Sequence, residues 1–273
     1  MTVAKESGET GRIAGTQAIS RAFAVLHLFR DHVGEPGGDR AGELGVGAVA
    51  RELGLTLSTA HRMIRALVAE GYLAQSPRSE RYYLGTAAFL LGQAAQRNLG
   101  LEAVRPVLEK LGADTGESVN LGMLDGGHAV IVQRVESSQP LRFSQSPGTR
   151  LTLYATSMGK VFLAFNTDLG AYLADLGPKL DRLTPKTHGS ARSLRGDLKA
   201  IRERGWSTDD EESILGVRCV GAPVLDAEGK ARAAIAVQAP AVRMPDARYD
   251  ELGPLVVAAA DAIAPLLPAG HAI

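Results

Sequence analysis

The stretch GAVARELGLTLSTAHRMIRALVAEGYL, residues 47–73, decides the fold of the N-terminal part of this chain. Three apolar residues in its first part recur at helical spacing and predict a short helix: Val49, Ala50 and Leu53. Gly54 suits the left-handed conformation that ends a helix and turns the chain, and Leu55 then fills the space before the next helix. The pattern therefore predicts a helix-turn-helix.

Thr56 or Ser58 can cap the second helix, which is expected to end at Gly71. Its inward positions keep a 3.6-residue period: Ala60, Met63 or Ile64, Leu67 and Val68. The opposite face is rich in hydrogen-bond donors: Ser58, Thr59, His61, Arg62 and Arg65. Arg62 and Arg65 are the candidates for base edges, Ser58 and Thr59 for phosphates, and His61 for either. The alternative is a solvated polar face on an ordinary helix.

Two short strand patterns, YLAQ and RYYLG, flank the polar turn SPRSE and predict a wing. Arg78 at its tip and Arg81 beside it are expected to reach the DNA backbone or the adjacent minor groove. Upstream, apolar spacing predicts an amphipathic helix from Gln17 to about Arg30. Its inward positions are Ile19, Phe23, Leu26 and Phe29 or Arg30, and Ala22 and Val25 widen the apolar face. Residues 1–14 are expected to be a disordered tail, and the glycine-rich stretch 33–45 a long loop.

Beyond the wing, residues 86–97 predict a connecting helix, and another helix is expected from Leu101. Four strand-like segments form two hairpins around glycine turns: 118–123 with 129–135, and 217–225 with 231–237. Further helices are expected near 157–166, 193–204 and 250–266. These patterns predict an α+β protein whose C-terminal half is an antiparallel sheet flanked by helices, rather than a parallel Rossmann sheet.

Composition limits the possible partners and compartment. The chain has 273 residues, 45% of them hydrophobic, which favours two domains with packed cores. Thirty basic residues balance thirty acidic ones, so contact with DNA must come from a local patch. The single cysteine, Cys219, excludes an internal disulfide and fits a reducing, cytoplasmic location. No secretory signal is expected, because residues 1–15 are polar and lack an apolar stretch. No membrane span is expected either, because the apolar C-terminal run is interrupted by Asp261 and two prolines.

No enzymatic or metal-binding motif is evident. The acidic run from Asp209 to Glu212 suggests a metal site or an acid/base pair, but HxH, HExxH and CxxC spacings are absent, so neither is favoured. No phosphate-binding loop or GxSxG sequence occurs either. We therefore expect no metal and no cofactor. Cys219 is expected to be a buried, inert thiol.

Six pieces of the chain, in order, resemble the IclR family of transcription regulators: QAISRAFAVLHLF, GLTLSTAHRMIRAL, GYL with YYLG, LYATSMGKVFLAF, LTPKT and RGWSTDDEESILGVRCVGAPVLDAEGK. The resemblance implies a winged helix-turn-helix over 15–85 and a linker helix over 86–100. It implies that 101–273 form an effector-binding domain related to GAF and profilin-like folds. It also implies a homodimer or homotetramer on double-stranded, palindromic operator DNA, with effectors that are often aromatic or small organic acids.

The resemblance maps an effector pocket onto eight positions: Leu151, Ser157, Met158, Gly159, Asp209, Cys219, Ala236 and Gln238. Similar regulators of very small oxo-acids tend to have hydroxyl side chains at the last two, so Ala236 and Gln238 disfavour a glyoxylate-sized or pyruvate-sized effector. The residues themselves add that Thr156 or Ser157 caps a helix, and that Gly159 lets a ligand or chain approach its N–H groups, which suits a carboxylate. An ordinary helix cap is the alternative. Phe143, Leu151 and Met158 would supply an apolar wall.

These patterns together predict a sequence-specific DNA-binding regulator, repressor before activator, whose operator binding responds to a small carboxylic acid. Two alternatives stay open. In one, the C-terminal half only oligomerises, without a ligand. In the other, it carries an enzyme.

Overall fold

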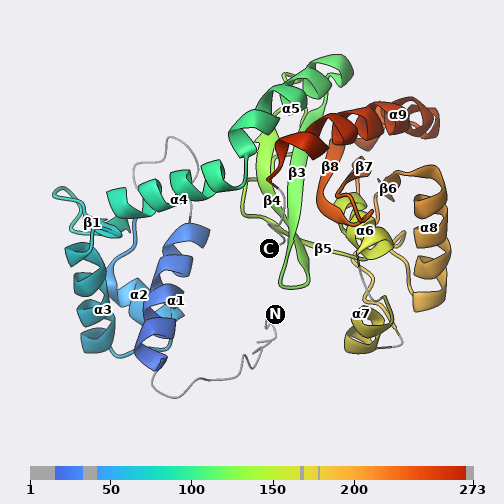
Figure 1. The fold of residues 1–273 in the computed structure, drawn as a ribbon. Coiled ribbons are helices and arrows are strands. Elements are labelled where there is room, and N and C mark those ends of the chain that lie inside the picture. Colours follow the sequence, from blue (N-terminus) through green and yellow to red (C-terminus); the bar gives the residue numbers. More distant parts are fainter. Residues whose placement is uncertain (1–15, 33–41, 167–168, 178, 269–273) are drawn as a thin grey trace. The chain divides into compact units, whose positions relative to one another are not determined.

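The computed structural model describes residues 16–32, 42–166, 169–177 and 179–268. The chain divides into two compact units, Met1–Ala95 and Gln96–Ile273 (Figure 1). The predicted tail over 1–14 and most of the predicted loop over 33–45 lie outside the described residues.

The N-terminal unit contains the predicted helix-turn-helix and wing. Its elements are α1 (Gln17–Asp31), α2 (Val46–Glu52), α3 (Leu57–Ala69), β1 (Leu73–Gln75) and β2 (Tyr82–Leu84). The strands β1 and β2 pair antiparallel, as the wing requires. Leu44, at the end of the predicted loop, exchanges two backbone hydrogen bonds of 2.9 Å with Tyr82, so this part of the chain extends the wing rather than forming a free loop.

Helix α3 begins and ends as its sequence predicts. Thr56, rather than Ser58, caps it, because the Thr56 hydroxyl oxygen accepts a hydrogen bond from the N–H of Thr59 at 3.2 Å. Gly54 and Gly71 have positive φ angles of 62° and 74°, which glycine adopts without a steric penalty. The core-facing stripe of α3 consists of Ala60, Ile64 and Leu67.

The prediction for α1 was wrong in one respect. Val25 and Phe29 are buried, but Ile19 and Phe23 are 57% and 55% exposed. Only the second half of α1 packs on the core of this unit, so the apolar stripe of its first half is left open to solvent. Helix α4 (Thr86–Asn98) contains no buried residue, and three of its large apolar side chains are more than half exposed: Phe89, Leu90 and Leu91.

The second unit is built on the predicted antiparallel sheet, whose strands lie in the order β5-β4-β3-β8-β7-β6. The strands are β3 (Ser118–Asp125), β4 (His128–Val135), β5 (Arg150–Thr152), β6 (Ser207–Asp210), β7 (Val217–Leu225) and β8 (Ala231–Pro240). The two predicted hairpins are β3-β4 and β7-β8. Pairing of β3 with β8 joins them, and the short strands β5 and β6, which we did not predict, form the edges.

Helices cover both faces of this sheet (Figure 1). One face carries α5 (Leu101–Thr115) and α9 (Asp246–Ile263), followed by a 3-10 turn at Ala264–Leu266. The other carries α6 (Ser157–Phe165), α8 (Ala191–Arg204) and the unpredicted α7 (Leu169–Leu176). Successive side chains of β8 point to opposite faces of the sheet. Ile235 packs against the face covered by α5 and α9, and Ala234 and Ala236 pack against the face covered by α6.

Within the part of the chain that the structure describes, every helix is too short or too polar to cross a lipid bilayer.

Candidate functional site

Helix α3 presents the predicted DNA-contact residues on its outer face. Ser58, His61, Arg62 and Arg65 are exposed. Within the described part of the chain, neither the Arg62 side chain nor the Arg65 side chain takes part in a hydrogen bond or an ion pair, so both guanidinium groups are available to an external acceptor. Thr59 differs from its neighbours, because it is half-buried and its hydroxyl accepts a hydrogen bond of 2.8 Å from Thr56. That hydroxyl therefore belongs to the helix cap.

The wing places Arg78 at its exposed tip and Arg81 half-buried beside it. Glu80 between them has a φ of 58°, an uncommon left-handed conformation for a residue other than glycine. The turn is held by Ser79, whose hydroxyl donates to a Glu43 carboxylate oxygen at 2.6 Å. The wing is thus fixed to the strand-like segment around Leu44.

In the second unit, strand register brings distant residues together. Asp209 of β6 pairs with Cys219 of β7, and Cys219 pairs with Gln238 of β8. Directly paired residues of antiparallel strands point to the same face, so these three side chains form a row across three strands. Asn120 of β3 pairs with Ala236 in the adjacent row. All five side chains face the side of the sheet covered by α6.

A small cavity lies between these rows and the start of α6. Seven of the nine predicted pocket residues line it: Leu151, Ser157, Met158, Asp209, Cys219, Ala236 and Gln238. Five lining residues had not been assigned to the pocket: Asn120, Gln145, Thr156, Ser213 and Ile214. Strand alternation could have placed Asn120, whereas Gln145, Ser213 and Ile214 lie on loops whose course no local pattern predicts.

Phe143 and Gly159 are not among the lining residues. The backbone carbonyl oxygen of Phe143 accepts a hydrogen bond from Arg134, and Arg134 in turn contacts residues that line the pocket. Gly159 packs against backbone: a Cβ there would lie 2.4 Å from the Cα of Leu153. Its N–H donates to the hydroxyl of Thr156, the cap residue of α6, at 3.2 Å. We expected either a ligand or another part of the chain to approach Gly159 closely, and in the structure it is the backbone of Leu153 that does so.

A buried arginine lies beside the pocket. The Arg134 side chain is only 4% exposed. Its Nη1 donates to the amide oxygens of Asn120 at 3.0 Å and Gln238 at 3.1 Å. Burial lowers the pKa of Arg134 from its usual value. Because a guanidinium only donates, it turns both amide oxygens toward itself and leaves the amide NH₂ groups as the remaining donors. The Gln238 NH₂ group donates to Gln145 at 3.0 Å.

Asp209 lies two strands from Gln238 and is almost fully buried. Its carboxylate oxygens accept from the N–H of Glu212 at 2.7 Å and from the hydroxyl of Ser213 at 2.5 Å. Burial outweighs these hydrogen bonds and raises the pKa of Asp209 to about 6. Burial likewise raises the pKa of the Cys219 thiol well above its ordinary value.

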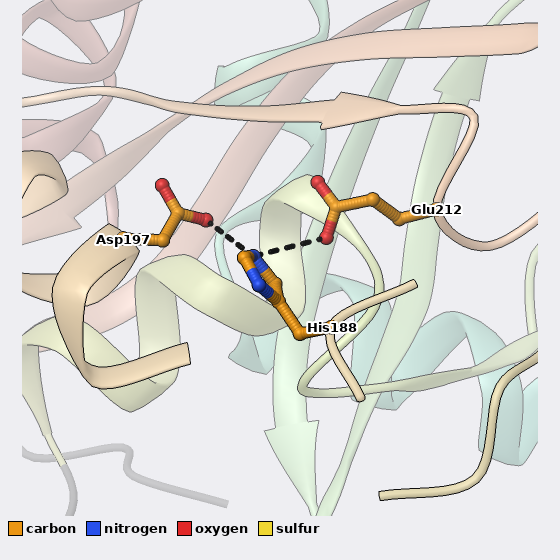
Figure 2. A group of neighbouring side chains, drawn as sticks. All are labelled: His188, Asp197 and Glu212. Atoms are coloured by element: carbon orange, nitrogen blue, oxygen red, sulfur yellow. Dashed lines mark hydrogen bonds and ion pairs between the residues drawn. The ribbon is translucent and has the colours of Figure 1, made fainter. Parts of the chain in front are cut away.

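Behind the pocket, a buried lysine forms ion pairs with two carboxylates. Lys160 of α6 is fully buried, and its Nζ lies 2.7 Å from Asp197 of α8 and 2.5 Å from Glu212. Burial opposes the charge of Lys160, but the two carboxylates outweigh it and raise its pKa. Figure 2 shows His188 between the same carboxylates, with Nε2 3.3 Å from Asp197 Oδ2 and 3.6 Å from Glu212 Oε2.

The segment LTPKT, residues 183–187, explains how His188 and Glu212 meet. Thr187 donates to the carbonyl oxygen of Glu212 at 2.6 Å, and Thr184 donates to that of Glu211 at 2.7 Å. These two hydroxyls attach the segment to the acidic turn after β6. His188 follows Thr187 directly, so its ring is carried to the carboxylate of Glu212.

A winged helix-turn-helix in one unit and a polar pocket in a second α+β unit define a transcription regulator of the ligand-responsive class. Comparison with known families agrees with this class. Residues 18–77 match the IclR helix-turn-helix domain, and residues 93–265 match the bacterial transcriptional regulator IclR C-terminal domain. The chain belongs to the IclR family, and it is therefore a DNA-binding transcription regulator rather than an enzyme.

Individual relatives match over most of their length. The chain is 35% identical to the HTH-type transcriptional regulator BhcR of Paracoccus denitrificans, over 90% of this chain and 85% of that protein. It is 34% identical to the acetate operon repressor of Salmonella typhimurium, over 94% and 92%. The crystal structure of Thermotoga maritima IclR superposes with a TM-score of 0.72 at 27% identity, covering 90% of this chain and 97% of that one.

Proposed function

We propose that this regulator represses transcription in the cytoplasm by binding a palindromic operator, and that a small organic acid in the second unit changes its affinity for that operator. The acetate operon repressor of Salmonella typhimurium, named above, supports repression as the first choice over activation. The observation that carries the ligand half of the proposal is the pocket itself, enclosed between the sheet and α6 and lined by polar side chains.

The polar groups of the pocket favour an anion at one end. Arg134 supplies a buried positive charge, and it leaves the amide NH₂ groups of Asn120 and Gln238 as donors. The start of α6 adds backbone N–H groups and the positive end of the helix dipole next to Ser157. A carboxylate matches these donors. Asp209 at the other end would repel a second carboxylate, so we infer a monocarboxylate with a hydroxyl or amino group facing Asp209.

For the DNA half, we propose Arg62 and Arg65 as base-reading residues, with Ser58, His61, Arg78 and Arg81 on the backbone or minor groove. Thr59 acts through the cap of α3. An arginine that donates twice to a guanine contributes about 1–3 kcal/mol of discrimination. Two subunits are needed to read a palindrome, because each recognition helix contacts one half-site.

Fluorescence anisotropy tests the DNA half. The full chain is titrated onto labelled DNA from upstream of its own gene, with excess unrelated duplex. Arg62→Ala combined with Arg65→Ala is expected to lose the competitor-resistant binding, while Arg195→Ala, an exposed arginine of α8, retains it. Unchanged affinity and sequence preference in the double variant would show that α3 is not the recognition helix. If the wild type does not bind specifically, the titration is repeated with aliphatic and aromatic acids present.

Thermal denaturation tests the ligand half. A ligand that binds only the folded chain raises its melting temperature by mass action. We expect some hydroxy or amino monocarboxylates to raise it, and their uncharged amides to have no effect. Gln145→Ala, on the pocket, should reduce the shift, and Gln139→Ala, an exposed loop glutamine, should preserve it. If no acid in a broad panel stabilises the chain, the ligand-independent oligomer becomes the better hypothesis.

A further inference from the structure

The cluster behind the pocket has one carboxylate oxygen without a hydrogen-bond partner. The Glu212 side chain is only 8% exposed, and its Oε1 accepts from Lys160. Its Oε2 is buried and makes no hydrogen bond with any described residue, although it points toward His188 (Figure 2). A buried carboxylate oxygen normally has a donor, because leaving it unsatisfied is costly. This oxygen therefore indicates a missing partner.

The spacing of the surrounding atoms suggests what the partner is. Nε2 of His188 lies 3.3 Å from Asp197 Oδ2 and 3.6 Å from Glu212 Oε2. Both distances are long for charge-assisted hydrogen bonds, which are about 2.7–2.9 Å. Ligand atoms held about 2.1 Å from a tetrahedral ion lie about 3.4 Å from one another. The ligating atoms of all three residues lie within 4.8 Å of one another.

The balance of charges in the cluster also favours the binding of a cation. Lys160 compensates one of the two carboxylates. Two carboxylates and one lysine leave one formal negative charge in the cluster without an ammonium or guanidinium partner. One nitrogen and two carboxylate oxygens are a donor set that suits zinc and similar divalent ions.

We propose that His188, Asp197 and Glu212 form a binding site for a divalent transition-metal ion of the zinc type. His188 binds it through Nε2, and the two carboxylates bind through the oxygens that face His188. Lys160 is not a ligand. It holds both carboxylates in place by donating to Asp197 Oδ2 and Glu212 Oε1, as outer hydrogen-bond partners of metal ligands do. A solvent molecule completes the coordination of the ion, because three protein ligands leave a fourth position.

The site would act on the pocket through a single turn of chain. The N–H of Glu212 donates to Asp209, and Ser213 and Asp209 both line the pocket. A metal held by Glu212 therefore fixes the acidic turn that forms one wall of the ligand site. This site is separate from the proposed effector site, and it stands or falls independently of it.

The test is zinc binding to the full chain after EDTA treatment and removal of the chelator. Competition with a chromophoric zinc chelator gives stoichiometry and affinity. We expect one zinc ion per wild-type chain, with affinity reduced at least tenfold in His188→Gln. His128→Gln is the matched control, since His128 is an exposed histidine of the same unit. Zinc should raise the melting temperature of the wild type and of His128→Gln, but not that of His188→Gln.

Two results would overturn the proposal. One is a wild type that takes up no stoichiometric zinc. The other is equal affinity in the wild type and His188→Gln, which would mean that the bound zinc lies elsewhere in the chain. Asp197→Asn gives a second test that preserves the shape of the site, and it should weaken zinc binding as well. Melting temperatures without metal verify that both variants fold.

Discussion

Asp209 illustrates how burial changes the chemistry of a side chain whose type is visible in the sequence. In the run from Asp209 to Glu212 four acidic residues look equivalent. The structure separates them, because Asp209 is buried against the pocket while Asp210 and Glu211 pair with Lys186 in a more exposed position. Burial raises the pKa of the Asp209 carboxyl to about 6.

This difference predicts a pH dependence. The folded chain binds the Asp209 proton more tightly than the unfolded chain, whose pKa is 3.8. The contribution of Asp209 to stability is therefore full below pH 3.8 and is lost as the pH rises through 6. Relative to Asp209→Asn, the wild type should lose about 2 kcal/mol of stability between pH 4 and pH 7. Melting curves of both proteins across this range measure the difference, and parallel pH profiles would contradict the assignment.

Cys219 provides a second measurement, since it is the single cysteine of the chain. Burial raises the pKa of its thiol, and the thiolate is the reactive form. We expect the native chain to react with iodoacetamide at pH 7.5 far more slowly than the chain unfolded in guanidinium chloride. Mass spectrometry follows the modification. Similar rates in both states would show that the pocket opens freely to solvent.

Among the helices, α6 connects the pocket to the core. It is buried over nearly its whole length, and Thr156 caps it beside the cavity. Its close contact with the Leu153 segment is possible because residue 159 has no side chain. The sequence indicated that Gly159 permits a close approach but not whether ligand or chain approaches. That depends on where residues 151–155 return to the helix.

Two glycine substitutions test this role. Gly159→Ala should destabilise the second unit by several kcal/mol, because the new methyl group would overlap the backbone of Leu153. Gly196→Ala is the matched change in α8, where a Cβ meets nothing within 4 Å. It should be neutral or stabilise by up to about 1 kcal/mol, since alanine is the better helix former. Equal melting temperatures in the two variants would disprove the packing role.

The exposed apolar side chains of α1 and α4 bear on assembly of the chain. Ile19 and Phe23 on α1, and Phe89 to Leu91 on α4, are all more than half exposed. Such large apolar side chains on adjacent turns are typical of surfaces that bind a partner. We propose that they bind a second copy of this chain, since the proposed palindromic operator requires two recognition helices.

Light scattering after size exclusion tests the assignment. Phe89→Ser is expected to shift the chain toward the monomer and to weaken operator binding more than tenfold. Val242→Ser, which changes an 81% exposed apolar residue of the second unit, is the control and should leave the mass unchanged. A Phe89→Ser protein with wild-type mass and operator affinity would place the interface elsewhere.

Much of this protein can be inferred from local pattern. Period and glycine position predicted α3, its outward arginines, the wing and the two hairpins, because these features depend on neighbours a few residues away. The inward face of α1 was assigned wrongly, because the same apolar stripe serves a core or an exposed surface. The edge strands β5 and β6 were missed, because three or four residues carry too little periodicity.

The pocket and the His188 cluster belong to the tertiary structure. Asp209, Cys219 and Gln238 become neighbours only through the register of three strands. His188, Asp197, Glu212 and Lys160 come from a loop, two helices and a turn, so no spacing motif joins them. Residue types and local conformation follow from the sequence. The distances between side chains far apart in the chain, and therefore their pKa values and possible ligands, depend on how the sheet and helices pack.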